Sequence, residues 1–146
     1  MRESFTVSSE HRLEYLPSIE GKHFVNDSKA TNVNSTWYAL EEMPGKVILL
    51  MGGVDKGNDY SILLDVVKKK VRYIIFIGND NKPLIKAFKN IVPFTEADTM
   101  RVAVLTAFKI AERGQTILLS PACASFDRYE NYEERGREFK KIVKSL

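Results

Sequence analysis

The chain has 146 residues, of which 44% are hydrophobic and 28% charged, and its formal net charge is +3. This length predicts one domain, residues 1–146, and the composition is typical of a globular protein. No long apolar run and no basic leader followed by an apolar stretch is present, so we expect no membrane span, no secretory signal and a cytoplasmic location. A single cysteine, Cys123, with only His11 and His23 beside it, excludes an internal disulfide and a Cys/His metal site.

The first part of the chain predicts an antiparallel pair of strands at the edge of a sheet. Residues 11–16 and 22–25 flank a turn-rich link. His11 and His23 are expected at solvent-facing positions of this pair. Residues 2–9 resemble the tail of a linker, which suggests that the chain is cut from a longer parent.

Four apolar runs predict buried strands at residues 47–51, 73–77 and 116–119, with a weaker one near residues 91–94. The three strong runs are continuous rather than alternating, which is typical of parallel strands covered on both faces. They predict an α/β fold with a Rossmann-like, open, mostly parallel sheet, helices on both faces and an antiparallel edge at the N-terminus.

Segments of helical period lie between these strands and after the last of them. In chain order they are Val33, Trp37, Leu40 and Met43; Leu63, Val66 and Val67, with Asp59 as the N-cap; residues 82–89, with Pro83 in the first turn; Met100, Val104, Ala107, Phe108 and Ala111, behind Asp98 and ending at Gly114; and Tyr132, Phe139, Ile142, Val143 and Leu146.

A run of three lysines, residues 68–70, could indicate nucleic-acid binding. It ends a predicted helix, however, where cations complement the helix dipole, and basic residues are not interleaved with aromatic ones on one face. We therefore expect a solvated helix end and no nucleic-acid partner.

Three polar clusters each follow a predicted strand, at residues 26–34, 52–59 and 120–127. In open α/β sheets, ligands bind beyond the carboxyl ends of the strands. The three clusters should therefore meet at one rim of the sheet and form a site there.

Each cluster also has a purely structural interpretation. If the second cluster is purely structural, Gly52, Gly53 and Gly57 have no role other than to provide positive φ angles in a strand-to-helix turn. Lys56 does not complete a phosphate-binding loop, since the G-x-x-x-x-G-K-[ST] pattern is absent, but it can still bind a carboxylate or phosphate as a point charge. Cys123 has no nearby histidine base, which favours a packed thiol over a nucleophile.

Lys29 lies in the sequence Asp-Ser-Lys-Ala-Thr-Asn, ahead of the first predicted helix. It could be a surface lysine beside an N-cap formed by Ser28 or Thr31. A cation at a helix N-terminus opposes the dipole, however, and needs a compensating reason. Binding of an anion by Lys29, the Thr31 hydroxyl and the free N–H groups of the helix end would supply that reason.

Three motifs in this order and spacing resemble the C-terminal domain of the muramyl ligases. They are residues 26–32 (Asn-Asp-Ser-Lys-Ala-Thr-Asn), residues 50–57 (Leu-Met-Gly-Gly-x-Asp-Lys-Gly) and residues 118–127 (Leu-Leu-Ser-Pro-Ala-Cys-Ala-Ser-Phe-Asp), followed by Asn131, Glu134, Arg135, Gly136 and Phe139. The resemblance covers essentially the whole chain. The Asp-Ser-Lys-Ala-Thr-Asn form resembles the family member that adds D-glutamate.

The resemblance implies a three-domain, ATP-dependent ligase of peptidoglycan synthesis that adds D-glutamate to UDP-N-acetylmuramoyl-L-alanine through an acyl phosphate. The domains implied for the UDP-sugar and for ATP with Mg²⁺ are absent from this sequence. We therefore expect the chain alone to be inactive, with no catalytic residue and no metal ligand of its own.

By motif position, the resemblance implies a D-glutamate site formed by Lys29, Thr31, Lys56, Ser125, the backbone at Phe126 and Tyr132, and nucleotide contacts at Arg12 and Asp27. Phe126 stands where leucine is usual and Tyr132 where phenylalanine is usual. D-Glutamate has two carboxylates, and Lys29 with Thr31 and Lys56 with the Ser125 turn provide two anchors for them. The alternative is a stand-alone α/β binding module for a small anionic ligand or nucleotide, without catalysis.

Overall fold

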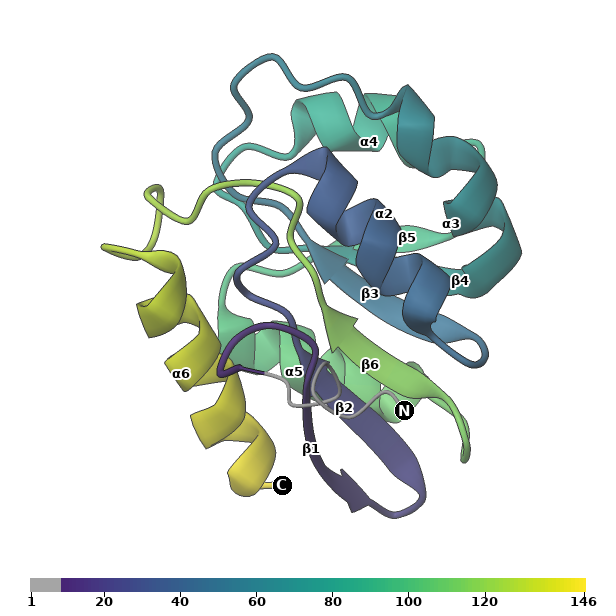
Figure 1. Cartoon of the computed structure of the whole chain (residues 1–146), viewed down its shortest axis with the longest axis vertical. Coiled ribbons are helices and arrows are strands. Elements are labelled where there is room, and N and C mark those ends of the chain that lie inside the picture. Colours follow the sequence, from purple (N-terminus) through teal and green to yellow (C-terminus); the bar gives the residue numbers. More distant parts are fainter. Residues whose placement is uncertain (1–8) are drawn as a thin grey trace.

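One six-stranded sheet of order β1-β2-β6-β3-β4-β5 runs through the chain, which the computed structural model describes from residue 9 to residue 146 (Figure 1). The strands are β1 (Glu14–Ile19), β2 (Lys22–Asn26), β3 (Val47–Met51), β4 (Val71–Phe76), β5 (Phe94–Glu96) and β6 (Thr116–Leu119). The β1–β2 pair is antiparallel and the other pairs are parallel, which confirms the expected fold class. Of the predicted linker, residues 2–8 lie outside the described residues.

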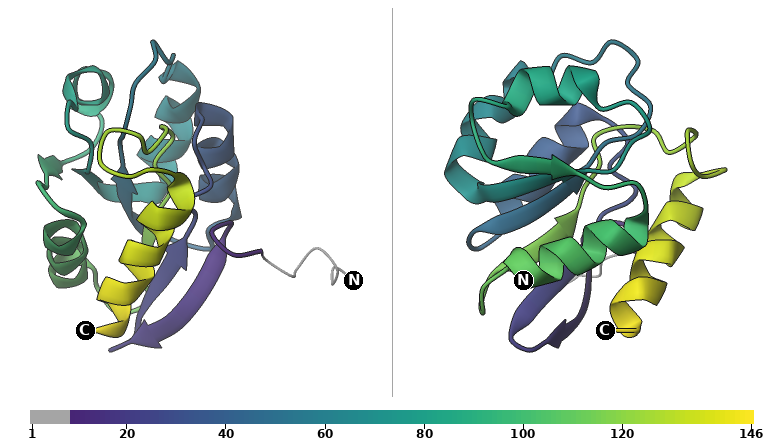
Figure 2. Two further views of the ribbon diagram at one scale, coloured as in Figure 1. Left: turned by 90° about the vertical axis from the view of Figure 1, so that its left-hand side faces the viewer. Right: turned by 180° about the vertical axis from the view of Figure 1, so that it is seen from behind.

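Helices cover both faces of this sheet. They are α2 (Val33–Glu42), the 3₁₀ turn η1 (Ser61–Leu63), α3 (Leu64–Lys70), α4 (Lys82–Phe88), α5 (Met100–Ile110) and α6 (Tyr132–Lys144). Residues of α2, α3 and α4 contribute to one buried apolar cluster, and residues of α5 and α6 contribute to the other. Figures 1 and 2 show α2 and α5 on opposite sides of the sheet. Within the described residues, no helix is long and apolar enough to cross a membrane.

The central strands explain why their apolar runs are continuous. In β3, Leu49 and Met51 pack into the cluster under α2 and α3, whereas Ile48 and Leu50 pack into the cluster under α5 and α6. Both alternating sets are therefore buried, and every residue of the strand is apolar. The predicted boundaries of β3 and β6 are confirmed to the residue.

The edge strand β5 is displaced from its predicted position near residues 91–94. It spans only Phe94–Glu96 and pairs with β4 from Ile74 onward. Pro93 accepts a hydrogen bond from the N–H of Ile74 but has no N–H to donate, so the ladder begins at the next residue. Strand β4 also begins two residues earlier than predicted, at Val71.

The N-cap of α2 is Asn32, not Ser28 or Thr31. The side chain of Asn32 accepts a hydrogen bond from the N–H of Ser35 at 2.9 Å. The Ser28 hydroxyl instead donates to the Tyr132 carbonyl at 2.7 Å. Ser28 therefore joins two segments that are distant in sequence and does not cap the helix beside it.

Two other predicted helix starts differ by a short step. Asp59 accepts the N–H of Ser61 at 2.9 Å but is not an N-cap: the N-cap of η1 is Tyr60, and neither η1 nor α3 begins with a side-chain cap. Thr99 rather than Asp98 caps α5, through its hydroxyl and the N–H of Val102. The lysine run at residues 68–70 forms the last turn of α3, as expected for a helix end.

We expect Gly53→Ala to lower the free energy of unfolding by about 2–4 kcal/mol, because a Cβ there would lie 2.1 Å from the Ala124 carbonyl oxygen. Gly45→Ala is the matched control, since a Cβ at Gly45 meets no atom within 4 Å. Urea denaturation of both variants measures the difference. Equal stability of the two variants would show that the contact between these loops is not tight in solution.

Candidate functional site

The carboxyl ends of β2, β6 and β3 lie side by side in the sheet. Asn26 of β2 is level with Leu119 of β6, which is level with Leu50 of β3. Two hydrogen bonds continue this register past the strands: Asp27 N–H donates to the Leu119 carbonyl (2.8 Å) and Ser120 N–H to the Leu50 carbonyl (3.2 Å). The three polar clusters therefore start at one rim (Figure 1), where ligands bind in open α/β sheets.

The loop after β3 and the loop after β6 are joined by backbone hydrogen bonds. Gly52 N–H donates to the Pro121 carbonyl at 2.9 Å, and Val54 N–H donates to the Ala124 carbonyl at 2.8 Å. Residues 54 and 124 form an isolated antiparallel bridge. The backbones of the two loops are thus paired beyond the end of the sheet.

Lys56 lies at the tip of the first of these loops. The Asp55 carboxylate accepts the backbone N–H of Asn58 at 3.1 Å, which closes a turn around Lys56 and Gly57. Gly57 has a φ of +79°, which is the positive backbone angle expected of a glycine in this turn. The Lys56 side chain itself is exposed.

The loop after β2 has a fixed backbone and an exposed lysine. Lys29 N–H donates to the His11 carbonyl at 2.9 Å, and the Ala30 carbonyl accepts the N–H of Ala122, also at 2.9 Å. The Lys29 side chain is exposed and Thr31 is half-buried. The loop is therefore attached both to the segment before β1 and to the loop after β6.

Ser125 and Phe126 occupy the turn at the end of the third loop. The Ser125 side chain is buried, and its carbonyl accepts the N–H groups of Arg128 (3.1 Å) and Tyr129 (2.9 Å). The Phe126 side chain is 65% exposed. Tyr132 is half-buried at the first position of α6. All six residues expected to bind D-glutamate thus lie on these three loops and at the start of the adjoining helix.

Arg135 is a buried residue that the sequence motif included but to which we assigned no role. It is 1% exposed, and it donates to the Ser28 hydroxyl (3.0 Å), the Ser28 carbonyl (2.9 Å) and the Cys123 carbonyl (3.1 Å). Its position three residues after Tyr132 and four before Phe139, on the apolar face of α6, is a signal that could have identified it. Cys123 is fully buried, and burial raises the pKa of its thiol, as expected of a packed residue.

Asp27 is a buried carboxylate at the start of the first loop. It accepts the Leu13 N–H at 3.0 Å and the Ser120 hydroxyl at 2.8 Å. Burial raises its pKa to about 6, although both hydrogen bonds and the Arg12 charge act in the opposite direction. A cavity of about 200 Å³ opens beside it and is lined by Arg12, Leu13, Asp27, Ala30, Asn34, Ser35, Tyr38 and Ala39. The two residues expected to contact a nucleotide therefore share one cavity.

His11 is buried, and the prediction of a solvent-facing strand position is wrong for it. It precedes β1, is 3% exposed, and its Nδ1 is 2.9 Å from the Asn26 side-chain nitrogen. A Cβ at Gly136 of α6 would lie 2.1 Å from the same Nδ1, so a glycine there makes room for the ring. His23 lies exposed on β2, as predicted.

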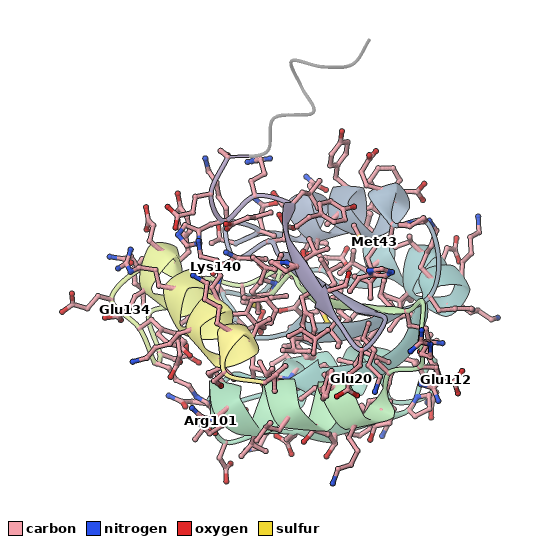
Figure 3. All side chains as sticks on the ribbon, turned by 90° about the horizontal axis from the view of Figure 1, so that it is seen from below. Glu20, Met43, Arg101, Glu112, Glu134 and Lys140 are labelled. Carbon is pink, nitrogen blue, oxygen red and sulfur yellow. The ribbon has the colours of Figure 1, made fainter. Side chains whose placement is uncertain are left out.

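Glu10, His11 and Glu14 each place one potential metal-ligand atom within 4.8 Å of the others. The Lys140 ammonium already lies 2.7 Å from Glu10 and 3.0 Å from Glu14, so both carboxylates have a cation. Lys140 lies on α6 (Figure 3). This group therefore ties the segment before β1 to the last helix.

A network around Asn79 was missed at the sequence level. Its backbone N–H donates to the Asp127 carboxylate (2.9 Å) and its side-chain amide to the Asp127 carbonyl (3.0 Å). Arg128 donates to the Asn79 side chain at 2.7 Å and to the Gly78 carbonyl at 3.1 Å. The polar run that follows β4 was the available signal, because it lies at the same rim as the other three clusters.

Comparison with known proteins gives consistent matches. The family model described as "Mur ligase, glutamate ligase domain" matches residues 11–123. The chain is 53% identical over 137 residues to the UDP-N-acetylmuramoylalanine–D-glutamate ligase of Porphyromonas gingivalis, covering 93% of this chain and 30% of that protein. It is 51% identical over 138 residues to the ligase of the same name from Christiangramia forsetii, covering 94% and 31%. The chain thus spans less than a third of the length of these relatives.

Two solved structures share the fold. They are the MurF ligase of Thermotoga maritima in complex with ADP (TM-score 0.56, 14% identity, covering 95% of this chain and 33% of that one) and a murein peptide ligase of Psychrobacter arcticus (TM-score 0.59, 8% identity, covering 94% and 30%). At these identities the likeness shows the fold alone.

We expect the stability of the chain to depend on pH through Asp27. Because burial raises the pKa of Asp27 from 3.8 to about 6, the folded state holds this proton more tightly than the unfolded chain. The stabilisation that comes from protonated Asp27 is therefore fully present below pH 3.8 and is lost as the pH rises to about 6. The free energy of unfolding falls by about 3 kcal/mol at most over this range. Asp27→Asn removes this loss, since its amide can donate to Ser120 while its oxygen still accepts from Leu13.

The measurement is urea denaturation of the wild type and Asp27→Asn between pH 4 and pH 8. The advantage of the variant should grow from pH 4 to about pH 6 and then stay constant. Glu10 and Glu14 have lowered pKa values and act in the opposite direction, but they are common to both proteins and cancel in the difference. A difference that does not change with pH would contradict the raised pKa of Asp27.

Proposed function

Because this chain belongs to the family of Mur ligase glutamate ligase domains, we propose that it presents D-glutamate in an ATP-dependent ligase of peptidoglycan synthesis. The acceptor in this proposal is UDP-N-acetylmuramoyl-L-alanine. The relatives that are named D-glutamate ligases support this proposal, since their sequence identity extends over nearly the whole chain. The observation that carries the proposal is the convergence of three loops with fixed backbones at one rim, where two of them present the exposed lysines Lys29 and Lys56.

D-Glutamate suits such a rim because it carries two carboxylates and an amine that must be neutral to attack. Lys29 with the Thr31 hydroxyl is proposed to bind one carboxylate, and Lys56 with the turn at Ser125 is proposed to bind the other. Charge-assisted hydrogen bonds to carboxylates are among the strongest that side chains make. The backbone at Phe126 and the Tyr132 side chain are proposed to complete the pocket.

Arg12 and Asp27 are proposed to contact ATP. The Asp27 carboxylate can accept hydrogen bonds from ribose hydroxyls, and the Arg12 guanidinium can pair with a phosphate. The cavity that these two residues share supports the assignment. Mg²⁺ would accompany the phosphates, held mainly by parts of the parent enzyme outside this chain.

The proposed reaction forms and consumes an acyl phosphate. The terminal carboxylate of the UDP-sugar peptide attacks the γ-phosphorus of ATP and releases ADP. The neutral amine of D-glutamate then attacks the acyl carbon, phosphate leaves with the C–O bond electrons, and the nitrogen releases one proton to solvent as the amide forms. We assign no step of bond breaking to a residue of this chain, so the chain alone is proposed to be inactive. Its cytoplasmic location and the lack of a nucleic-acid partner stay predictions.

We expect Lys29→Ala and Lys56→Ala, made in the longer parent enzyme, to lower kcat/KM for D-glutamate by about ten- to a hundredfold. A charge-assisted hydrogen bond to a carboxylate contributes about 1.5–3 kcal/mol. Both side chains are exposed, so stability should stay within about 0.5 kcal/mol of wild type. Lys56→Met should do no better than Lys56→Ala, because charge is lost and not volume.

The matched control for these variants is Lys109→Ala, an exposed lysine on α5 away from the rim. Steady-state kinetics with D-glutamate varied, beside thermal melts, separate the possibilities. Unchanged kinetics for both rim lysines would contradict the proposed function. A large fall in melting temperature would instead make them structural residues.

We expect Arg12→Ala in the parent enzyme to raise KM for ATP by about tenfold while leaving KM for D-glutamate within about twofold. The reason is that Arg12 lines the cavity beside Asp27 and is not on the loops assigned to D-glutamate. Arg101→Ala, on the outer face of α5, is the control (Figure 3). If KM for D-glutamate rises instead, the cavity belongs to the amino-acid site.

A further inference from the structure

Tyr60 is a buried residue that the proposed reaction does not use. It directly precedes η1, is 5% exposed, and its ring packs against Phe88 with the ring centroids 6.0 Å apart. The ring belongs to the apolar cluster under α2, α3 and α4. Its hydroxyl, by contrast, is in contact with polar groups of the rim loops.

The hydroxyl contacts two of these loops. It donates to the Asp55 carboxylate at 3.0 Å, and it lies 3.4 Å from the sulfur of Cys123. The Asp55 oxygen that accepts it also accepts the backbone N–H of Asn58 at 3.1 Å. One carboxylate oxygen of Asp55 therefore closes the turn that carries Lys56. The same oxygen accepts a hydrogen bond from Tyr60, whose ring is packed in the core.

The protonation states make this contact persistent. Burial and the hydrogen bond with Cys123 raise the pKa of Tyr60 far above its ordinary value, and burial raises the pKa of Cys123. Both groups therefore keep their protons near neutral pH. The Tyr60 hydroxyl remains a donor to Asp55 over the whole range in which an enzyme of this kind would work.

We propose that the Tyr60 hydroxyl is a positioning group for Lys56. By holding Asp55 it fixes the turn at residues 55–58, and through Cys123 it sets that turn relative to the loop that carries Ser125. The inference rests on the proposed function in one respect only, which is that Lys56 binds a carboxylate of D-glutamate. The hydroxyl is not needed to fill space, because phenylalanine would pack the same ring against Phe88.

The first test measures amide hydrogen exchange in the chain itself. Tyr60→Phe should speed exchange of the Asn58 N–H by about threefold to tenfold, the effect of one lost hydrogen bond. Tyr73→Phe is the matched control, because Tyr73 lies on β4 and its hydroxyl bonds no other described residue. Asp55→Ala should speed the same exchange, and adding Tyr60→Phe to it should have a smaller effect than Tyr60→Phe alone, since the hydroxyl then keeps only its 3.4 Å hydrogen bond from the Asn58 side-chain amide among its contacts with this turn.

The second test measures kinetics in the longer parent enzyme. Tyr60→Phe should raise KM for D-glutamate by about threefold to tenfold and change kcat by less than about twofold. Asp55→Asn, which keeps an acceptor oxygen for both hydrogen bonds, should restore most of the affinity lost in Asp55→Ala. A residue that only stabilised the fold would not give this rescue or this division between KM and kcat.

Unchanged exchange at Asn58 in Tyr60→Phe would overturn the proposal. Faster exchange with an unchanged KM would also overturn it, provided that Lys56→Ala still raises KM, because the proposed function would then stand without Tyr60. If neither Lys56→Ala nor Lys29→Ala affects D-glutamate, the proposed function fails instead. The exchange result would then still report whether the hydroxyl holds the turn.

Discussion

A buried guanidinium holds the rim of the sheet together. Arg135 is almost fully buried, takes part in no ion pair among the described residues, and bonds Ser28 and Cys123 on two different loops. Burial of an unpaired charge is costly unless it is hydrogen-bonded, and here each of the three guanidinium nitrogens donates one hydrogen bond. Burial lowers its pKa to about 10, so the group stays charged at neutral pH. The loops after β2 and β6 and the start of α6 therefore form one unit.

The parts of the fold that could be predicted from sequence are those with a local cause. The runs at Val47–Met51 and Thr116–Leu119 predicted the bounds of β3 and β6 to the residue, because strands buried on both faces are almost wholly apolar, with Thr116 the one polar residue in these two strands. The rim could also be predicted, since parallel strands place their carboxyl ends together. Even β5, displaced by Pro93, follows a local rule that was available in the sequence.

The parts that could not be predicted depend on partners far along the chain. His11 is buried because Gly136 of α6 leaves room for its ring, and nothing near His11 in the sequence indicates this. Ser28 has the residue type of an N-cap, but its hydroxyl bonds the Tyr132 carbonyl, so Asn32 caps α2. In both cases α6, the last helix, decides the conformation of a segment near the start of the chain.

The same distinction separates the residues of the candidate site. Lys29 and Lys56 are exposed, and they can be distinguished from other surface lysines in the sequence because they lie in loops with many small polar residues. Arg135 and Tyr60 are buried, and their polar atoms are satisfied within the protein, so they look like ordinary core positions in a sequence. Side chains that we propose to bind a ligand can thus be found from local pattern, whereas the buried groups that hold their loops become visible only when the fold brings their partners together.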